Sequence, residues 1–220
     1  MKLEDIRQDI PEALFNVISK YNFEDLRPCQ EKAINAGLFS GKNLVVCTPT
    51  ASGKTLIAEL SCLKNIIEGK GRAIYIVPLK ALASEKYRNF RKAYPYIRVG
   101  LATGDLDSRD EFLNRCDLVI ATAEKMDSLI RHKVPWIKEI HTIVVDETHL
   151  LNDPGRGPTL EILITILKKV LPQCQIIALS ATIGNPKVLA EWLDAELVED
   201  DWRPVELKSG TYLDGELDFV

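Results

Sequence analysis

Short runs of apolar, mostly β-branched residues recur along the chain, with longer polar and amphipathic stretches between them. The runs predict six strands, at Asn43–Cys47, Ala73–Val77, Arg98–Ala102, Leu118–Ala121, Thr142–Asp146 and Gln175–Ser180. Most of the runs are continuous rather than alternating, which is typical of strands buried on both faces of a parallel sheet. The pattern therefore indicates a mainly parallel central sheet.

Helical patterns lie before and between these runs. The clearest segments are Pro11–Tyr21, Pro28–Gly37, Gly53–Glu68 and Leu160–Leu171. Two helix starts are also marked: Ser108–Glu111 fits a capping box, and Asn185 followed by Pro186 fits an N-cap with proline at the first helical position. Strands that alternate with helices predict an α/β domain with helices on both faces of the sheet.

The pattern changes after Leu193. Leu197–Gly210 is predicted to be extended chain, and the last ten residues, Thr211–Val220, contain no complete predicted element. We therefore expect one domain whose lead-in helices cover residues 1–40, whose main body covers 41–196 and whose exit segment covers 197–220.

Composition limits the partners and the compartment that we expect. The chain has 220 residues and is 46% hydrophobic, which is enough to bury the core of one large domain. Its net charge of −4 means that any nucleic acid must be held by a local basic strip rather than by a global positive field. Five scattered cysteines and the lack of a membrane-length apolar run predict a cytoplasmic protein with reduced thiols and no membrane partner.

The segment from Asn43 to Thr55 has the order of strand, turn-rich loop and helix start that polyphosphate binding requires. Backbone N–H groups converge on phosphate at such a helix start, where Gly53 permits close approach, Lys54 supplies a charge and the Thr55 hydroxyl can ligate Mg²⁺. The expected nucleotide-binding residues are Thr50, Ala51, Ser52, Gly53, Lys54 and Thr55. Thr48 stands where such a loop usually begins with glycine, and the competing interpretation is a polar turn before an ordinary helix.

A strand that ends in acidic residues would supply the second half of such a site. The predicted strand Thr142–Asp146 ends in acid and is followed directly by Glu147. Asp146 can hold Mg²⁺ through water, and Glu147 can then polarise an attacking water molecule. Alone, the pair could equally be a solvated turn. Together with the phosphate loop, it predicts that Glu147, Asp146 and Lys54 are catalytic residues.

Three segments of the chain, in this order, resemble motifs I, II and III of superfamily 2 helicases with a DExH box. The segments are Thr48–Thr55, Asp146–His149 and Ser180–Thr182. The resemblance covers about residues 20–210, and its specificity lies in the ordered set. It implies the first RecA-like domain of such an enzyme, with a P-loop NTPase fold.

Further motifs of the same family agree. Leu26–Gln30 is similar to the adenine-recognising Q motif, Val77–Leu82 to motif Ia, and Ala121–Lys125 to motif Ib. Within the family, Thr122–Arg131 and Asp146–Glu161 most resemble the Ski-type branch and its archaeal fork-processing, Holliday-junction-migration DNA helicases.

The resemblance implies a site for ATP and Mg²⁺. Gln30 would read the adenine edge because its amide offers both a donor and an acceptor, and Arg27 or Phe23 would stack beside it. The alternative for Gln30 is a solvated helix residue. Thr55 and Asp146 would ligate the metal.

The resemblance also implies residues that contact nucleic acid or couple it to the nucleotide. These are Pro78, Lys80, Thr122, Lys125, Arg156, His149, Ser180 and Thr182. Residues that follow the motif Ia and Ib strands lie at the carboxyl edge of the sheet, where ligands of open α/β sheets bind. Gly104 and Asp105 also fall in a family motif. The helix after motif Ia carries a basic run whose outer part we expect to be a solvated face: Lys80, Lys86, Arg88, Arg91 and Lys92.

The family hydrolyses ATP between two RecA-like domains, the second of which supplies an arginine finger. The sequence has no Q-x-x-G-R-x-G-R-like run. We therefore expect an exit segment that leads toward a second RecA-like domain, and an isolated chain that binds nucleotide weakly and unwinds little. The expected function is an ATP-dependent 3′–5′ DNA helicase or translocase for replication-fork repair or recombination, acting on single-stranded or forked DNA. A Ski-type RNA helicase and a nucleotide-binding half-motor without unwinding activity remain open.

Overall fold

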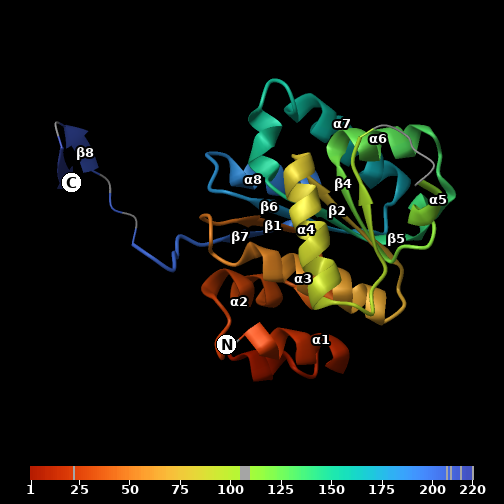
Figure 1. Ribbon diagram of the computed structural model, residues 1–220, viewed down its shortest axis with the longest axis horizontal. Helices are drawn as coiled ribbons and strands as arrows, with labels where there is room; N and C mark the ends of the chain where they lie inside the picture. Colours follow the sequence, from red (N-terminus) through yellow and green to blue (C-terminus); the bar gives the residue numbers. More distant parts are fainter. Residues whose placement is uncertain (22, 105–109, 207, 209, 214, 220) are drawn as a thin grey trace.

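A seven-stranded parallel sheet forms the centre of the protein (Figure 1). The computed structural model describes residues 1–21, 23–104, 110–206, 208, 210–213 and 215–219. The strand order is β3-β4-β2-β5-β6-β1-β7, and the strands are β1 Leu44–Cys47, β2 Arg72–Val77, β3 Val99–Ala102, β4 Leu118–Thr122, β5 Ile140–Val145, β6 Gln175–Ser180 and β7 Glu196–Glu199. The first six confirm the predicted strands, with ends that differ by at most two residues.

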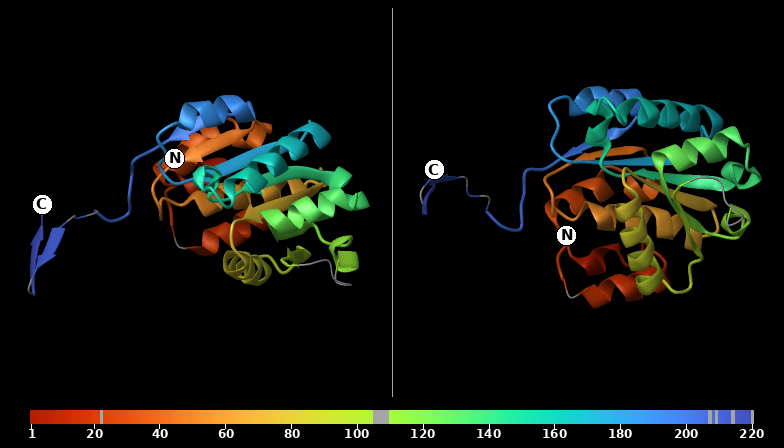
Figure 2. Two further views of the ribbon diagram at one scale, coloured as in Figure 1. Left: turned by 90° about the horizontal axis from the view of Figure 1, so that it is seen from above. Right: turned by 45° about the horizontal axis from the view of Figure 1, so that its top comes forward.

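Helices cover both faces of this sheet, as predicted (Figures 1 and 2). One layer holds α1 Glu12–Ile18, α2 Pro28–Asn35, α3 Lys54–Ile67 and α4 Lys80–Ala93. The other holds α5 Asp110–Leu113, α6 Ala123–Arg131, α7 Gly157–Val170 and α8 Pro186–Leu193. Short 3-10 helices are η1 Leu3–Ile6, η2 Ser19–Tyr21, η3 Leu38–Ser40, η4 Pro135–Glu139 and η5 Thr148–Asn152. None of the helices in the described part of the chain is long and apolar enough to cross a membrane.

Strand β2 shows why the apolar runs are continuous. Tyr75 and Val77 point into the core beneath α3 and α4, whereas Ile74 and Ile76 point into the core beneath α6 and α7. Successive side chains of a strand face opposite ways, so a sheet covered twice needs apolar residues at every position. Each fully buried side chain of this size contributes about 1.5–3 kcal/mol to the free energy of folding.

A buried polar cluster lies at the amino-terminal edge of the sheet, and we call it the amino-edge cluster. It consists of Ser61, Asn65, Thr142 and Gln175. Ser61 Oγ donates to Gln175 Oε1 at 2.7 Å, and Asn65 Nδ2 donates to Thr142 Oγ1 at 2.8 Å. Gln175 Nε2 donates to the carbonyls of Leu38 at 2.8 Å and Lys42 at 2.9 Å. These bonds join α3 to β5, β6 and the segment before β1, and they satisfy polar atoms that burial would otherwise penalise.

Segments outside residues 41–196, the predicted main body, also belong to the packed domain. Leu14 and Ile18 of α1 are fully buried in the core that α3 shares, so the lead-in helices pack on the main body. At the other end, β7 pairs with β1 from Leu44–Glu196 to Cys47–Glu199. The sheet therefore continues past residue 196, where we expected the main body to end.

The expectation that the last ten residues hold no complete element is wrong. Strand β8, Gly210–Leu213, pairs antiparallel with β9, Glu216–Phe219, in a two-stranded ribbon that lies apart from the main body (Figures 1 and 2). Gly215 has φ +94°, a conformation that glycine adopts without strain. The sequence signal was the pair Asp214-Gly215, which favours a two-residue hairpin turn.

Two predicted helix starts have different outcomes. Asn185 stands at the N-cap position before Pro186, as predicted, but its side chain makes no capping hydrogen bond in α8. The proposed capping box at Ser108 lies outside the described residues, although α5 begins at Asp110.

Candidate active site

The phosphate-type loop connects β1 to α3 and is closed by its own side chains. The Thr48 hydroxyl is buried and lies 2.7 Å from the hydroxyl of Ser52 across the loop. The loop backbone at Ala51 has a positive φ of 62°, which is uncommon for a residue other than glycine and often marks functional sites. Threonine at position 48 thus closes the loop by a side-chain hydrogen bond, which explains how the loop forms without the usual first glycine.

Gly53 is required at its position for two reasons. Its φ is +103°, and a Cβ atom there would lie 2.5 Å from Gln30 Nε2 and 2.9 Å from Arg27 Cδ. Both distances are too short for a real side chain. The close packing of α2 against the loop therefore depends on the missing side chain at this one residue.

The Lys54 ammonium lies over the loop rather than in solvent. Nζ donates to the backbone carbonyls of Thr48 at 2.7 Å and Pro49 at 2.8 Å. Burial lowers the pKa of Lys54, and the carboxylates of Glu147 and Asp146 partly oppose that shift. Phosphate oxygens are stronger acceptors for an ammonium than neutral carbonyls are, so they could replace both bonds.

The acidic pair follows β5, directly across from the loop. Asp146 Oδ2 accepts a hydrogen bond from the Tyr75 hydroxyl at 2.8 Å, and Oδ1 accepts one from the Glu147 N–H at 3.0 Å. Burial raises the pKa of Tyr75 well above its ordinary value, so the phenol remains a donor. Glu147 has a left-handed φ of 56°, which turns the chain sharply after the strand. The carboxylate of Asp146 is thus held in one orientation.

A basic side chain from α4 lies between the loop and the acidic pair. Lys86 Nζ donates to Thr55 Oγ1 at 3.1 Å and lies 3.6 Å from Asp146 Oδ2. We expected Lys86 to belong to a basic run with a solvated outer face, and the structure instead brings it to the two residues assigned to Mg²⁺. The sequence holds no local signal for this contact, because α4 and the loop are separated by the whole of α3 and β2.

These residues line one cleft of about 490 Å³ at the carboxyl edge of the sheet. The predicted residues that line it are Arg27, Thr50, Ala51, Ser52, Gly53, Lys54, Thr55, Asp146 and Glu147. The cleft also includes four residues that we did not assign to the nucleotide: Leu82, Glu85, Lys86 and Pro204. Pro204 lies in the exit segment, so that segment passes beside the loop.

Gln30 lies behind the cleft rather than in its lining. It is only 4% exposed, so the alternative of a solvated helix residue is wrong. Its Oε1 accepts from the Arg27 N–H at 2.9 Å, and its Nε2 donates to the Gly53 carbonyl at 3.0 Å. One N–H of the amide and one lone pair of its oxygen remain for a base edge. Adenine recognition by Gln30 stays a prediction.

Arg27 reaches both the loop and the exit segment. Its Nη1 donates to the Ala51 carbonyl, and its guanidinium lies 5.5 Å from the centre of the Trp202 ring. Trp202 was not predicted, and its contact with Arg27 spans 175 residues of sequence. Phe23 instead lies 6.4 Å from the ring of Tyr21 and does not line the cleft.

The predicted coupling residues follow the strand ends next to the cleft. His149 Nδ1 lies 3.3 Å from Glu147 Oε2, without hydrogen-bond geometry. The Ser180 hydroxyl is buried beside the Cys47 thiol, which is at best a weak hydrogen-bonding group, and it has no nitrogen or oxygen partner among the described residues. Thr182 is exposed in the loop after β6. Of these residues, His149 lies beside the acidic pair, and the coupling role of all three stays a prediction.

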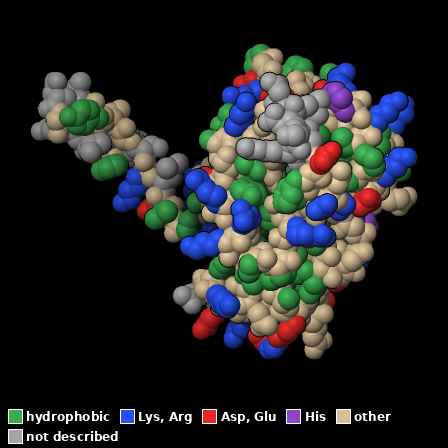
Figure 3. Space-filling model, turned by 45° about the vertical axis from the view of Figure 1, so that its right-hand side comes forward, with side chains coloured by type: hydrophobic (Ala, Val, Ile, Leu, Met, Phe, Trp, Pro, Cys, Tyr) green, Lys and Arg blue, Asp and Glu red, His purple; other side chains and the backbone are tan. Residues whose placement is uncertain are grey.

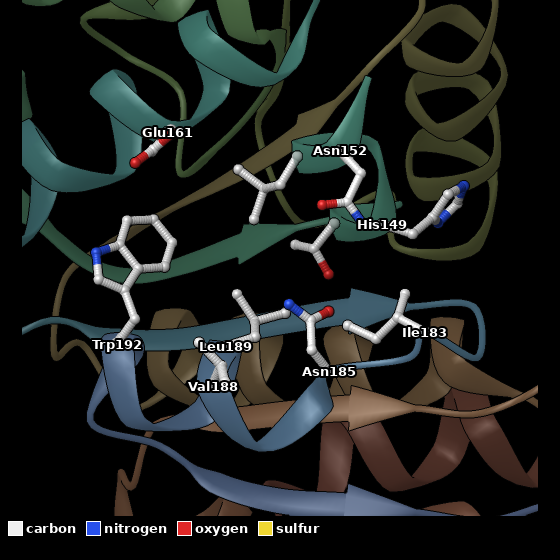
Figure 4. Close-up of a pocket in the computed structure, with 10 residues that line it drawn as sticks. His149, Asn152, Glu161, Ile183, Asn185, Val188, Leu189 and Trp192 are labelled. Carbon is white, nitrogen blue, oxygen red and sulfur yellow. The ribbon is translucent and has the colours of Figure 1, made fainter. Parts of the chain in front are cut away.

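His149 also faces a second cavity, of about 250 Å³, between η5, α7 and α8. Figure 4 shows side chains from η5 and α7 on one side, opposite Val188, Leu189 and Trp192 of α8. The cavity is lined mainly by apolar atoms and by Asn152 and Asn185, and it was not predicted from the sequence.

The residues expected to contact nucleic acid are divided between surface and interior. Lys80 and Arg156 are exposed, and Pro78 is half-buried. Thr122 and Lys125 are each only 3% exposed, and Thr122 Oγ1 caps α6 by accepting from the Lys125 N–H at 3.4 Å. A phosphate contact through the Lys125 side chain would therefore require that side chain to become exposed.

The motif Ia lysine, Lys80, lies near Gly104. Lys80 Nζ is the nearest atom to the position that a Cβ of Gly104 would take, at 3.9 Å, and Asp105 lies outside the described residues. On the face drawn in Figure 3, Lys and Arg side chains are interspersed with hydrophobic and acidic ones, rather than joined in one continuous basic strip. Any nucleic-acid contact on this face would thus depend on single basic residues.

The site fits a magnesium-bound nucleotide. Thr55 and Asp146 present hydroxyl and carboxylate oxygens, the ligand types that Mg²⁺ prefers, and a cationic Lys86 nitrogen lies between them. Lys54 and the N-terminus of α3 present an ammonium and the positive end of a helix dipole, which suit phosphate. A phosphate loop after β1 and an acidic pair after β5, at one edge of a parallel sheet, define a P-loop NTPase domain of the RecA-like type.

The family follows from comparison with known proteins. Residues 27–189 match the model of the DEAD/DEAH box helicase family. The chain therefore belongs to the DEAD/DEAH box helicase family, which confirms the helicase resemblance and implies the use of ATP. Its assignment to the Ski-type branch stays a prediction.

Individual relatives agree with this family. The chain is 50% identical to the ATP-dependent DNA helicase Hel308 of Methanocella arvoryzae over 218 residues, and 49% identical to Hel308 of Pyrococcus abyssi over 208. The matches cover 96% and 94% of this chain but 29% of each relative. A crystal structure of the DUF1998 helicase MrfA bound to DNA and AMPPNP superposes with a TM-score of 0.78 at 26% identity, covering 88% of this chain and 30% of MrfA.

Proposed function

We propose that this chain is the ATP-binding domain of an ATP-dependent DNA helicase or translocase. The observation that carries the proposal is the single cleft in which the phosphate loop, Lys54, Asp146 and Glu147 face one another. The proposed division is a lead-in with the Q motif over residues 1–40, the first RecA-like domain over 41–196 and an exit segment over 197–220. The relatives are more than three times as long as this chain, which supports a second RecA-like domain in the parent protein.

Each residue of the cleft has a distinct task in the proposed reaction. Lys54 and the first N–H groups of α3 bind the phosphates, and Thr55 and Asp146 hold Mg²⁺. Mg²⁺ bound there would neutralise charge that develops on the phosphates. Glu147 orients the attacking water and accepts its proton, since it lines the same cleft as Asp146 and its N–H donates to Asp146 Oδ1 at 3.0 Å.

The proposed partner is DNA, as a single strand or a fork, with 3′–5′ translocation in replication-fork repair or recombination. The names of the Hel308 relatives and the DNA-bound MrfA structure support this substrate. The exposed residues Lys80 and Arg156, at the same sheet edge, support a contact with phosphates that positions a strand without reading its sequence.

The proposal is tested by Glu147→Gln in the full-length protein. We expect ATP binding within about twofold of wild type and an ATPase rate lower by about 100-fold or more, because a general base contributes about 10²–10⁴ to the rate. The matched control is Glu191→Gln, an exposed residue of α8 away from the cleft. Near-normal turnover in Glu147→Gln would refute the assigned base. Stimulation by single-stranded RNA rather than DNA would refute the proposed substrate.

A further inference from the structure

Lys86 has an unusual place for a residue of a basic surface helix. Its side chain is only 15% exposed, and its ammonium donates to Thr55 Oγ1 at 3.1 Å and lies 3.6 Å from Asp146 Oδ2. The same ammonium lies 5.3 Å from the centre of the Tyr75 ring, and Tyr75 in turn donates to Asp146. Lys86 therefore contacts the oxygens assigned to the metal and the residue that orients one of them.

An ammonium and Mg²⁺ cannot share this position. Mg²⁺ binds a hydroxyl oxygen at about 2.0–2.1 Å and keeps much of its water shell, which here must fit between Thr55 and Asp146. The Lys86 nitrogen lies 3.1 Å from Thr55 Oγ1 and 3.6 Å from Asp146 Oδ2, so a hydrated ion held by these two oxygens would lie close to it. Two cations a few ångströms apart repel strongly, and more so in a partly buried cleft than in water.

We propose that Lys86 is a positioning residue that competes with the divalent cation for Thr55 and Asp146 and must move away before the metal binds. This inference rests on the proposed ATP and Mg²⁺ site. Without metal, the ammonium bridges the two oxygens and offsets the negative charge of Asp146. When the metal binds, the hydrogen bond from Lys86 of α4 to Thr55 breaks.

A second carboxylate is available to the displaced ammonium. Glu59 lies one helical turn after Thr55 on the same face of α3, and it accepts a hydrogen bond from the Tyr94 hydroxyl at 2.8 Å. Burial raises the pKa of Glu59, and the nearby charge of Lys86 opposes that shift. Movement of Lys86 toward Glu59 would relieve the burial cost of that carboxylate.

The consequence reaches the edge that we assign to nucleic acid. Helix α4 begins at Lys80, directly after the motif Ia segment, and Lys86 lies almost two turns further along the same helix. When a metal displaces the Lys86 ammonium, α4 loses its contacts with Thr55 of α3 and with Asp146, which follows β5. Metal binding in the cleft is thereby linked to the helix that carries an exposed lysine at the proposed nucleic-acid edge.

The test measures the affinity of this 220-residue chain for Mn²⁺, a paramagnetic substitute for Mg²⁺, by electron paramagnetic resonance with a non-hydrolysable ATP analogue present. We expect Lys86→Met to bind Mn²⁺ about tenfold more tightly than wild type, because the competing charge is gone. Lys92→Met, on the exposed side of the same helix, should match wild type. Lys86→Gln, whose fold is checked by circular dichroism, should act like Lys86→Met.

The outcomes separate this inference from the proposed function. Asp146→Asn should lose Mn²⁺ binding both alone and together with Lys86→Met. A wild-type chain that binds the ATP analogue but shows no analogue-dependent Mn²⁺ binding would refute the metal site itself. If wild type binds Mn²⁺ and Lys86→Met binds it equally or more weakly, competition by Lys86 is refuted while the metal site stands. If Lys86 had only a structural role, Lys86→Met would lower the melting temperature without raising the affinity for Mn²⁺.

Discussion

Helix α3 carries a polar cluster near each end, and the two clusters differ in how their polar atoms are used. The amino-edge cluster of Ser61, Asn65, Thr142 and Gln175 is fully buried, and its members bond to one another and to nearby carbonyls. We call the other one the carboxyl-edge cluster, which consists of Lys54, Thr55, Asp146 and Ser180. Lys54 there bonds to the carbonyls of its own loop, and Ser180 has no nitrogen or oxygen partner among the described residues.

The difference shows which cluster stabilises the fold and which is arranged for a ligand. Buried polar atoms in native proteins nearly always have partners, so an unpaired one needs a specific reason. In the amino-edge cluster the partners belong to the protein, and the bonds join helix to sheet. In the carboxyl-edge cluster, Lys54, Thr55 and Asp146 line an open cleft, and the left-handed backbone at Ala51 and Glu147 is of the kind that is common at ligand sites, so these groups are arranged for partners from outside.

The largest effect that the comparison predicts is on binding, at the carboxyl edge. We expect Lys54→Met to weaken binding of a fluorescent ATP analogue by about 10- to 100-fold, because a charged hydrogen bond contributes about 1.5–3 kcal/mol. The melting temperature should hardly change. Lys187→Met, an exposed lysine of α8, should bind like wild type. Unchanged binding in Lys54→Met would contradict our assignment of the carboxyl-edge cluster to ligand binding.

Lys54 also predicts a dependence of stability on pH. Burial lowers the pKa of Lys54 in the folded chain below its ordinary value of 10.5. Between those two values the unfolded chain binds more protons, so this residue makes the free energy of unfolding rise with pH. Urea titrations across that interval should show a rise in wild type that is larger than the rise in Lys54→Met. If the free energy of unfolding rose equally with pH in wild type and in Lys54→Met, Lys54 would not be desolvated.

The next effect is on stability, at the amino edge. Gln175→Leu leaves the Ser61 hydroxyl and the carbonyls of Leu38 and Lys42 without their partner, which should cost about 3 kcal/mol. The melting temperature should fall by about 6–12 °C, and nucleotide binding below the transition should stay unchanged. The exposed neighbour Gln173→Leu should change the free energy of unfolding by less than about 0.5 kcal/mol.

The smallest expected effect is the difference in the free energy of unfolding between two variants, each of which lacks one hydroxyl of one cluster. Ser180→Ala removes a buried hydroxyl whose neighbour is the weakly hydrogen-bonding Cys47 thiol, so the free energy of unfolding should stay within about 0.5 kcal/mol of wild type or rise. Thr142→Val removes the acceptor of Asn65 Nδ2 and should cost about 1–2 kcal/mol. In the full-length protein, Ser180→Ala should still reduce the stimulation of ATPase by DNA. Equal losses of stability in both variants would contradict our assignment of roles.

The local sequence pattern was sufficient to predict the architecture and most of the residues that line the cleft. Continuous apolar runs predicted six of the seven sheet strands, because residues covered from both sides must all be apolar. The loop Thr48–Thr55 and the pair Asp146 and Glu147 were predicted because each chemical requirement is met by neighbours in sequence. Strand β7 was predicted only as extended chain, since its burial depends on a partner, β1, that lies about 150 residues away.

Tertiary structure decided the contacts that no local pattern encodes. Lys86 was grouped with exposed basic residues, and packing of α4 turned it into the cleft. Lys125 was expected to contact nucleic acid, and its side chain is only 3% exposed in the first turn of α6. A sequence specifies the charge and length of a side chain, but its environment depends on which distant segments pack around it. The sequence by itself thus determined a RecA-like sheet with a phosphate loop, and the fold alone decided which cation stands at the metal position.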